Sequence, residues 1–443
     1  VAGGTSAASR ARRINPDLEI TIFEKGEFVS YGACDEPYFL AGEIDSWERL
    51  LVRKPQQFKE KQNIDIRLNC EVTSINPGEK CITVLSRESG VSEVHKYDRL
   101  IIATGAKPRP CELPGAQAAN LFALKFLEQA RNIDEYIRAH KPHRAITVGA
   151  GFISMEMAEA FTKRGIKNTV LHRSSKPGGN TEPEIAEWLV DELQKQGVEY
   201  VPHCRPLSFE LDEKGLIRAV ITDKGKFECD MVLWATGVVP EVELAAAAGI
   251  KLGPTGAIAT DERMETSVPG IFAAGDCCEV THLISGRKIF TPLGDIANKQ
   301  GWAAGENAAG GDARYNGAVG SMHFRCFDME IGMTGLTEAQ AREFGYDVLY
   351  GSIDHASRAH AQPKRKPVRI KLVADRNTRR LLGAQIAGRE GAALRINTLA
   401  VALQAGMTIE EISGLDLAYA PPFSPVMDPI LLAARVLSKD SQS

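Results

Sequence analysis

The sequence predicts an α/β protein with two Rossmann-like nucleotide-binding domains and a C-terminal α+β domain. Three observations lead to this fold class. A glycine loop that opens a helix occurs twice, and two apolar strands end alike in Ala-Thr-Gly. From about residue 321 the composition changes to short strands and helices without another such loop. A length of 443 residues also favours two or three domains over one.

The first glycine loop lies at the start of the chain. Gly3 and Gly4 precede a helical run of small residues, and Glu24 and Lys25 follow an apolar strand about twenty residues later. Glycines let a pyrophosphate approach the helix N-terminus, and the acid can accept hydrogen bonds from a ribose. These four residues are candidate ligands of a dinucleotide. Since the unit begins part-way, we expect the complete protein to supply an apolar strand ending in Gly before Val1.

The second glycine loop runs from strand to helix without a gap. Residues 144–148 form the strand, Gly149 and Gly151 follow, and Ser154 takes the place of the third glycine. Serine is small enough to keep the helix close to the strand. This loop predicts a second dinucleotide site.

The strand after that loop indicates which nicotinamide nucleotide is bound. It ends in His172 and Arg173, where an acid would bind the 2′-hydroxyl of NAD. Because an arginine suits the 2′-phosphate of NADP, the pattern favours NADPH. The alternative, a solvated arginine at a strand end, leaves NADH open.

Further strand ends complete the nucleotide pattern. Each Ala-Thr-Gly end closes one nucleotide-binding half, and a Gly-Asp end suits a ribityl hydroxyl or a flavin phosphate. A helix that begins just before Ala297 would direct its N-terminus at a flavin carbonyl oxygen. The residues assigned to cofactors here are Thr104, Gly105, Gly237, Gly275, Asp276 and Ala297. Two dinucleotide loops with these ends, in this order, predict a flavoprotein that binds FAD and NAD(P)H.

A single cysteine marks the candidate active site. Cys34 follows the first strand and precedes Asp35, Glu36 and a Pro-Tyr pair, which indicates a loop leading into a short helix. A thiol reacts as the thiolate, whose population depends on local charge, helix dipoles and exposure. A structural cysteine would more naturally lie among Val, Leu and Ile. Cys34 is therefore a candidate redox or nucleophilic group.

Composition and cysteine usage exclude other classes. The net charge of −4 gives no reason to expect a nucleic-acid partner, and no apolar run reaches the roughly 20 residues that span a membrane. The nine cysteines show no C-x-x-C and no metal-ligand spacing, which suits a reducing cytoplasm and predicts no metal site. The pair Cys277–Cys278 is not expected to form a strained vicinal disulfide.

These features resemble the pyridine nucleotide–disulfide oxidoreductase superfamily over essentially the full chain. The best match is its single-cysteine branch of coenzyme A-disulfide reductases, coenzyme A-persulfide reductases and NADH oxidases or peroxidases. The resemblance is carried by residues 30–38, the tandem nucleotide motifs, the Gly-Asp end and the run Tyr-Ala-Pro-Pro-Phe-Ser at 419–424. It implies FAD-binding segments at 1–113 and 243–317, an NAD(P)H domain at 114–242 and a dimerisation domain at 318–443.

The resemblance also implies roles for individual residues. Cys34 would alternate between a thiol and a mixed disulfide beside the flavin, with coenzyme A as its typical partner. A C-x4-C dithiol would need a second cysteine near position 39, which is Phe39. In a homodimer with a shared active site, Tyr419 would reach the other subunit and hydrogen-bond or protonate the leaving thiolate. The nicotinamide would stack near Glu156, and the substrate would meet Ser30 and, at the coenzyme A phosphates, Arg10, Arg13 and Lys61.

Three departures from the family bear on the substrate. The segment 358–364 lacks the Tyr-Tyr-Pro-Gly of many coenzyme A-disulfide reductases and offers only His360 in its place. Asp35 and Glu36 replace small or apolar residues, and negative charge beside a thiol raises its pKa and disfavours anionic ligands. Ala2 stands where oxidases and peroxidases usually carry a histidine, which opposes oxygen or peroxide as the substrate.

We therefore expect a homodimeric, FAD-dependent reductase that uses NAD(P)H to cleave the sulfur–sulfur bond of coenzyme A disulfide, coenzyme A persulfide or polysulfide. The missing tyrosine shifts the preference slightly toward persulfide or polysulfide. Two alternatives stay open. One is an NAD(P)H oxidase whose Cys34 cycles through a sulfenic acid, and the other is a flavin-binding redox sensor without turnover.

Overall fold

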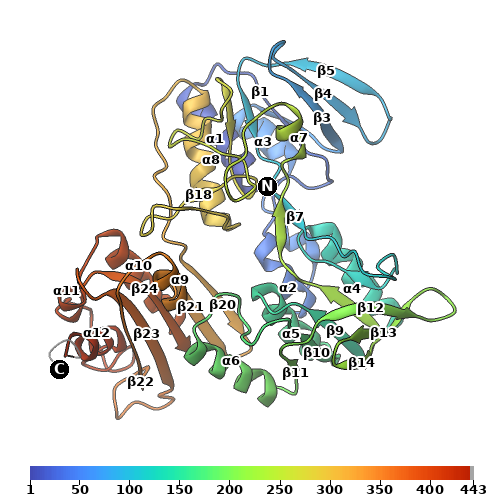
Figure 1. Ribbon diagram of the computed structural model, residues 1–443. Coiled ribbons are helices and arrows are strands. Elements are labelled where there is room, and N and C mark those ends of the chain that lie inside the picture. Colours follow the sequence, from blue (N-terminus) through green and yellow to red (C-terminus); the bar gives the residue numbers. More distant parts are fainter. Residues whose placement is uncertain (440–443) are drawn as a thin grey trace.

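The computed structural model describes residues 1–439 and shows three bodies of secondary structure. In Figure 1 most of the blue start of the chain and a yellow segment form the upper body, teal and green segments form the body at the lower right, and the orange-to-red end forms the body at the lower left. The short blue helix α2 (Glu36–Leu40) lies lower, beside the body at the lower right. The upper body is thus built from two segments that flank the second body in sequence. The end of the expected C-terminal domain, residues 440–443, lies outside the described part.

The upper body combines parallel strand pairs with an antiparallel meander. β1 pairs with β2 and β6 with β17, both in parallel, while β3, β4 and β5 form the meander and β7 pairs with β16. Its elements are α1 (Ala2–Ile14), β1 (Ile20–Phe23), η1 (Ala33–Asp35), α2 (Glu36–Leu40), η2 (Trp47–Leu50), α3 (Pro55–Gln62), β2 (Ile64–Arg67), β3 (Cys70–Asn76), β4 (Cys81–Ser86), β5 (Ser92–Lys96), β6 (Leu100–Ile102), β7 (Ala106–Pro108), β16 (Val238–Pro240), α7 (Glu243–Ala247), β17 (Ile271–Ala273), β18 (Val280–Thr281), β19 (Lys288–Ile289) and α8 (Gly294–Ala308).

Helices α1 and α8 pack backbone against backbone in this body. A Cβ at Gly305 would lie 2.1 Å from the carbonyl oxygen of Ala7, and one at Gly301 would lie 2.4 Å from that of Gly3. Glycine alone allows this approach, because any side chain would clash with backbone. A Cβ at Gly3 would in turn meet the carbonyl oxygen of Ala274 at 3.0 Å. The first glycine loop and the strand end after β17 are therefore brought together.

The second body is a Rossmann-like unit. Its five strands are all parallel, in the order β11–β10–β9–β15–β8, and a separate meander consists of β12, β13 and β14. Strands β9 and β15 are buried along almost their whole length, as central strands of a parallel sheet are. Its elements are β8 (Leu121–Phe122), α4 (Leu127–His140), β9 (Arg144–Val148), α5 (Phe152–Lys163), β10 (Lys167–Leu171), α6 (Pro183–Lys195), β11 (Glu199–Val201), β12 (Pro206–Leu211), β13 (Ile217–Thr222), β14 (Gly225–Glu228) and β15 (Met231–Trp234).

The third body is an antiparallel sheet with helices, in the order β20–β21–β24–β23–β22. Its elements are β20 (Met322–Cys326), β21 (Met329–Gly335), α9 (Glu338–Glu343), β22 (Val348–Ala356), β23 (Pro367–Asp375), β24 (Leu381–Gly388), η3 (Ala393–Arg395), α10 (Ile396–Gln404), α11 (Ile409–Ser413) and α12 (Pro429–Lys439). The expected fold class is confirmed. The domain boundaries given above stay predictions.

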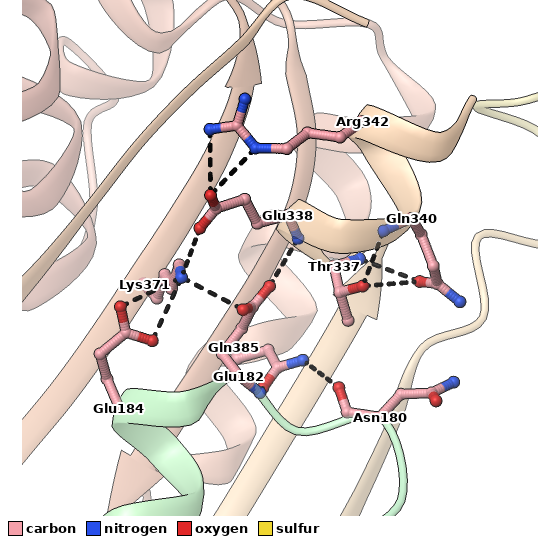
Figure 2. Close-up of polar contacts among 9 residues, drawn as sticks. All are labelled: Asn180, Glu182, Glu184, Thr337, Glu338, Gln340, Arg342, Lys371 and Gln385. Atoms are coloured by element: carbon pink, nitrogen blue, oxygen red, sulfur yellow. Dashed lines mark hydrogen bonds and ion pairs between the residues drawn. The ribbon is translucent and has the colours of Figure 1, made fainter. Parts of the chain in front are cut away.

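A buried ion-pair cluster joins the second and third bodies. Lys371 on β23 is 1% exposed, and its Nζ lies 3.1 Å from Glu182, 3.1 Å from Glu184 and 3.0 Å from Glu338. Figure 2 shows these carboxylates converging on the ammonium from the start of α6 and from α9. The cluster ties the start of α6, the helix between β10 and β11 of the parallel sheet, to the antiparallel sheet.

Candidate active site

Cys34 lies in the turn η1, directly before α2, so the expected loop leading into a short helix is confirmed. The loop is held because the amide of Gly32 donates to the carbonyl of Leu50 at 2.8 Å, and the carbonyl of Ser30 accepts a backbone bond at 3.0 Å. Cys34 is exposed, whereas Phe39 belongs to a buried core shared with α4 and α5. The position of a second dithiol cysteine is thus filled by a packed aromatic ring.

The charges around Cys34 mostly oppose formation of its thiolate. Burial raises the pKa of the Cys34 thiol, and the carboxylate of Glu156 raises it further. Asp35 and Glu36 act in the same direction, as the sequence predicted. Lys125 lowers this pKa. Although the thiol is open to solvent on one side, its reactivity therefore depends on nearby positive charge, which Lys125 is placed to supply.

Glu36, the first residue of α2, is a buried carboxyl group. It is 2% exposed, and its Oε1 has no hydrogen-bond partner within residues 1–439. Burial raises the pKa of Glu36 to about 8, while Lys125 lowers it and Glu128 raises it. At neutral pH the carboxyl group therefore keeps its proton in most molecules. An unsatisfied buried oxygen two residues from an exposed thiol indicates a site that a ligand completes.

Glu156 on α5 faces α2. The Tyr38 hydroxyl donates to Glu156 Oε1 at 3.4 Å, and the guanidinium of Arg325 lies 5.0 Å from the centre of the Tyr38 ring. Burial raises the pKa of Glu156 to about 7, and the bond from Tyr38 opposes this shift. Since Glu156 is the charge that most raises the pKa of Cys34, the structure brings these two predicted site residues together.

The first glycine loop fits a dinucleotide. Gly3 and Gly4 lie in the first turn of α1, which has no side-chain cap among the described residues, so its first amides are available to an anion. Glu24 directly follows β1, where a ribose would need an acceptor. Lys25 instead forms an ion pair with Glu241 at 2.5 Å. The glycines and the acid fit the predicted role, and Lys25 is engaged within the chain.

The Gly-Asp end after β17 lies close to α8. Asp276 forms an ion pair with Lys125 at 2.7 Å, and a Cβ on Gly275 would touch that of Ala297 at 3.5 Å. Lys125 thus pairs with Asp276 and also lowers the pKa of Cys34. The residues predicted to hold the flavin on this side therefore lie close together.

The Ala-Thr-Gly ends lie at the connector formed by β7 and β16. The Thr104 hydroxyl donates to the carbonyl of Glu241 at 2.6 Å, and Gly105 and Gly237 adopt φ values of +75° and +101°. The hydroxyl of Thr236 is buried and has no partner among the described residues. This orphaned group is one that a bound nucleotide would satisfy.

The second glycine loop fits a dinucleotide as well. Gly149 has a φ of +107°, and a Cβ there would lie 2.2 Å from the carbonyl oxygen of Ala235. Gly151 caps α5 and offers no side-chain acceptor to its first amides. The Ser154 hydroxyl is buried without a partner within residues 1–439. A pyrophosphate would satisfy the free amides at the start of this helix.

The two residues at the end of β10, His172 and Arg173, differ in their surroundings and in their charge. Nδ1 of His172 lies 3.0 Å from the Tyr200 hydroxyl. Burial lowers the pKa of His172, and Arg173 lowers it further, so the imidazole is neutral at pH 7. Arg173 is exposed. A 2′-phosphate at this strand end would therefore meet positive charge at Arg173 rather than at His172.

The residues assigned to the coenzyme A phosphates are only partly free. Nε of Arg10 donates to Glu306 at 2.8 Å, which neutralises this arginine within the chain. The guanidinium of Arg13 lies 5.8 Å from the centre of the Trp302 ring, and Lys61 is exposed near the end of α3. Arg13 and Lys61 are thus the more available cations.

Tyr419 and His360 belong to neighbouring segments of the third body. The amide of Ala359 donates to the carbonyl of Pro421 at 3.2 Å, so the two segments lie against each other. Tyr419 is 48% exposed and Phe423 is 78% exposed. Exposed aromatic rings of this kind suit a surface that a second subunit buries.

The remaining sequence predictions concern metal, membrane and disulfide. Cys277 and Cys278 are free thiols with sulfur atoms 3.7 Å apart, as expected. Across residues 1–439, His, Cys, Asp and Glu side chains do not gather in threes that could hold a metal ion. Over the same residues, we find no helix with the length and apolar character needed to cross a bilayer.

Sequence analysis missed three residues of this site. Lys125, Tyr38 and Arg325 meet Cys34 or Glu156 only in the folded chain. The Pro-Tyr pair was a visible signal for Tyr38, but nothing near Lys125 or Arg325 in the sequence distinguishes them from other surface cations.

Comparison with known families covers most of the chain. The sequence model of the family described as "Pyridine nucleotide-disulphide oxidoreductase" matches residues 2–300. A second, described as the dimerisation domain of the same family, matches residues 323–429.

Individual relatives extend over nearly the full length. The chain is 39% identical over 437 residues to the "NAD(P)H sulfur oxidoreductase (CoA-dependent)" of Pyrococcus furiosus, covering 98% of this chain and 97% of that protein. It is 34% identical over 434 residues to an "NADH oxidase" of Methanocaldococcus jannaschii, covering 98% and 96%. The solved structure of an NAD-dependent persulfide reductase from A. fulgidus superposes with a TM-score of 0.96 at 36% identity, covering 100% of this chain and 82% of that one.

Proposed function

Because this chain belongs to the pyridine nucleotide-disulphide oxidoreductase family, we propose that it uses NAD(P)H and FAD to reduce the sulfur–sulfur bond of a small thiol compound at Cys34. One observation carries the proposal. Cys34 is an exposed free thiol, and a buried phenylalanine occupies the position of a second dithiol cysteine. Cys34 must therefore share its sulfur with a substrate rather than with a neighbour in the chain.

The chemistry of the chain follows from this arrangement. FAD, when bound, supplies two-electron chemistry between NAD(P)H and sulfur. The Cys34 thiolate attacks one sulfur of the substrate, a Cys34–sulfur bond forms, the substrate bond breaks, and the other sulfur leaves as a thiolate. Two electrons from NAD(P)H then break the Cys34–sulfur bond, so that Cys34 returns to the thiolate and the sulfur compound bound to it leaves as a second thiolate. Lys125 favours the thiolate of Cys34, and the partner subunit's Tyr419 would protonate the leaving group.

The substrate class rests on the site and on the relatives. Coenzyme A disulfide, coenzyme A persulfide and polysulfide all carry the required bond. The absence of the Tyr-Tyr-Pro-Gly segment favours persulfide or polysulfide, and the names of the Pyrococcus and A. fulgidus relatives agree with a sulfur substrate. Coenzyme A would be held by Arg13 and Lys61, with Ser30 near the thiol.

The remaining assignments belong to the same proposal. The dimerisation domain implies a homodimer. In this homodimer the active site would be shared between the subunits. FAD would lie on the first glycine loop and the Gly-Asp end, and NAD(P)H on the second loop with Arg173. FAD-binding segments at 1–113 and 243–317 would flank the NAD(P)H domain at 114–242, before the dimerisation domain from residue 318.

An NAD(P)H oxidase with a Cys34 sulfenic acid is the second candidate. The similarity to the Methanocaldococcus NADH oxidase favours it. Ala2 opposes it, because the oxidases and peroxidases of the single-cysteine branch usually carry a histidine at this position. A flavin-binding sensor would bind nucleotide without steady-state NAD(P)H consumption.

Intact mass under denaturing, non-reducing conditions tests the proposal. We expect the purified protein to gain the mass of one coenzyme A or of added sulfur, and dithiothreitol to remove it. Cys34→Ser should abolish the gain and the sulfur reduction, while Cys111→Ser, which alters another partly exposed thiol, should leave both intact. A gain of oxygen atoms alone on Cys34, with no sulfur reduction, would overturn the proposal in favour of the oxidase.

A further inference from the structure

The short helix that follows Cys34 also makes contact with the nicotinamide side of the proposed site. Tyr38 lies on α2, four residues after the thiol, and its hydroxyl donates to Glu156 Oε1 on α5 at 3.4 Å. The bond is long for a hydroxyl donor, as catalytic hydrogen bonds often are without substrate. One side chain thus connects the helix of the reactive thiol with the carboxylate assigned to the nicotinamide.

The third body fixes Tyr38 from a further direction. Arg325 on β20 stacks on the Tyr38 ring at 5.0 Å, and its Nη2 contacts Glu43 at 2.5 Å and Glu159 at 3.0 Å. The carbonyl of Tyr38 also accepts the amide of Glu43 at 3.0 Å. These contacts hold the ring between segments from all three bodies, so the hydroxyl has little freedom to leave Glu156.

We propose that Tyr38 is a positioning residue that fixes the Glu156 carboxylate against the nicotinamide and is itself locked by Arg325. The inference rests on the proposed function, because it takes Glu156 as the nicotinamide contact. A carboxylate in this place would stabilise the positive charge that the oxidised nicotinamide ring carries. The oxidised nucleotide should therefore bind better than the reduced one when Glu156 is ionised.

The groups that face Glu156 set the pH at which its carboxyl group ionises and begins to favour the oxidised nucleotide. Burial raises the pKa of Glu156 to about 7, and Glu159 raises it too. Tyr38 and Arg325 lower it. The thiols of Cys34 and Cys326 also interact electrostatically with Glu156. Loss of the Tyr38 hydroxyl removes a donor to the carboxylate and must raise the pKa of Glu156.

The test measures binding of oxidised and reduced nicotinamide nucleotide to the FAD-loaded protein by calorimetry between pH 6 and 9. In the unaltered protein, affinity for the oxidised nucleotide should increase as pH rises through about 7. Tyr38→Phe should move this increase to higher pH and weaken binding at pH 7.5 by roughly threefold to tenfold, the size of one lost hydrogen bond. Tyr346→Phe is the matched control, because it also removes a tyrosine bond, to the carbonyl of Ile284 at 2.8 Å, in a different part of the fold.

A double variant separates positioning from general damage. In Glu156→Gln the pH dependence should disappear, and adding Tyr38→Phe should then change affinity by less than about twofold. If Tyr38→Phe binds both nucleotides with the affinity and pH profile of the unaltered protein, the inference is wrong. If Tyr38→Phe lowers the affinity for the oxidised nucleotide by the same factor in the Glu156→Gln background as in the unaltered protein, the tyrosine acts only through the fold. Failure of the unaltered protein to reduce its flavin with NAD(P)H would instead overturn the proposed function.

Discussion

Two buried clusters of carboxylates in this chain are built in opposite ways. Around Lys371, the ammonium contacts three carboxylates, Glu182 also accepts the amide of Glu338 at 2.6 Å, and Gln385 accepts the amide of Glu182 at 2.7 Å (Figure 2). Near Cys34, the Oε1 atom of Glu36 has no partner within residues 1–439. We call the cluster of Lys371 with Glu182, Glu184 and Glu338 closed, because its charges are paired within the chain. We call the cluster of Glu36 and Glu156, which both raise the pKa of Cys34, open, because one of its oxygens is left without a partner among residues 1–439.

The protonation behaviour of the clusters differs accordingly. Although burial opposes both shifts, the Lys371 bonds lower the pKa of Glu338, and the carboxylates raise the pKa of Lys371. At Glu36 and Glu156 burial prevails, and the pKa values rise to about 8 and about 7. Paired charges indicate an anchor. Carboxyl groups that titrate near neutrality, with one Glu36 oxygen left without a partner among residues 1–439, indicate a site awaiting ligand.

Removing the cation of the closed cluster should have the largest effect on stability. Lys371→Met leaves buried carboxylates without their counter-ion, and we expect the free energy of unfolding to fall by about 3–5 kcal/mol. Chemical denaturation at pH 7.5 measures the loss. Lys299→Met is the control. Lys299 pairs with Asp295 on an exposed helix face, so its replacement should cost less than about 1 kcal/mol. Equal losses in the two variants would contradict the anchor role.

The open cluster should respond to pH instead. Because the folded-state pKa of Glu36 is raised to about 8, its contribution to stability is present below the unfolded value near 4.5 and is lost as pH rises toward 8. Glu36→Gln removes this titration, so we expect the variant to be roughly 2–4 kcal/mol more stable than the unaltered protein at pH 8 and similar at pH 5. Denaturation curves at both pH values measure the difference.

An exposed glutamate supplies the control for that comparison. Glu135→Gln on α4 changes the same chemical group at the surface and should shift stability by less than about 0.5 kcal/mol at either pH. If Glu36→Gln gave no gain at pH 8, the carboxyl group would have a counter-ion in solution, and the open character of the site would be disproved.

The features that could be predicted from the sequence are those that depend on neighbouring residues in the chain. The glycine loops, the strand ends and Cys34 carry local signals, because close approach of backbone to phosphate and a turn before a short helix depend on neighbours in the chain. Glu36 could be noticed, but its burial could not, since that depends on how α2 packs on the second body. The engagement of Arg10 by Glu306 is likewise invisible in sequence, because the two residues are brought together only by the packing of α1 on α8.

The Lys371 cluster gave no sequence signal at all. Its members come from three separate segments, and a lysine within an apolar strand is as compatible with an edge position as with a buried one. In both clusters, residues distant in the sequence determine whether the charges are paired. The closed cluster has its partners within the chain, whereas the open cluster depends on residues and ligands that the local sequence pattern does not specify.

The smallest expected effect concerns the reactivity of Cys34 itself. Burial and Glu156 raise its pKa, and Lys125 lowers it, so the two charges should have opposite effects on the thiolate population. We expect alkylation of Cys34 by iodoacetamide at pH 7.5 to be about twofold to fivefold faster in Glu156→Gln and slower by a similar factor in Lys125→Gln. Peptide mass spectrometry follows Cys34 and Cys111 in the same sample, and the rate at Cys111 should not change.

Because Lys125 also pairs with Asp276, a changed rate at Cys34 in both variants would show that the flavin side and the nicotinamide side of the open cluster act on one thiol. Equal rates in all three proteins would mean that solvent at the exposed face of Cys34 screens both charges, and the thiolate would then have to be stabilised by the substrate or the bound flavin instead.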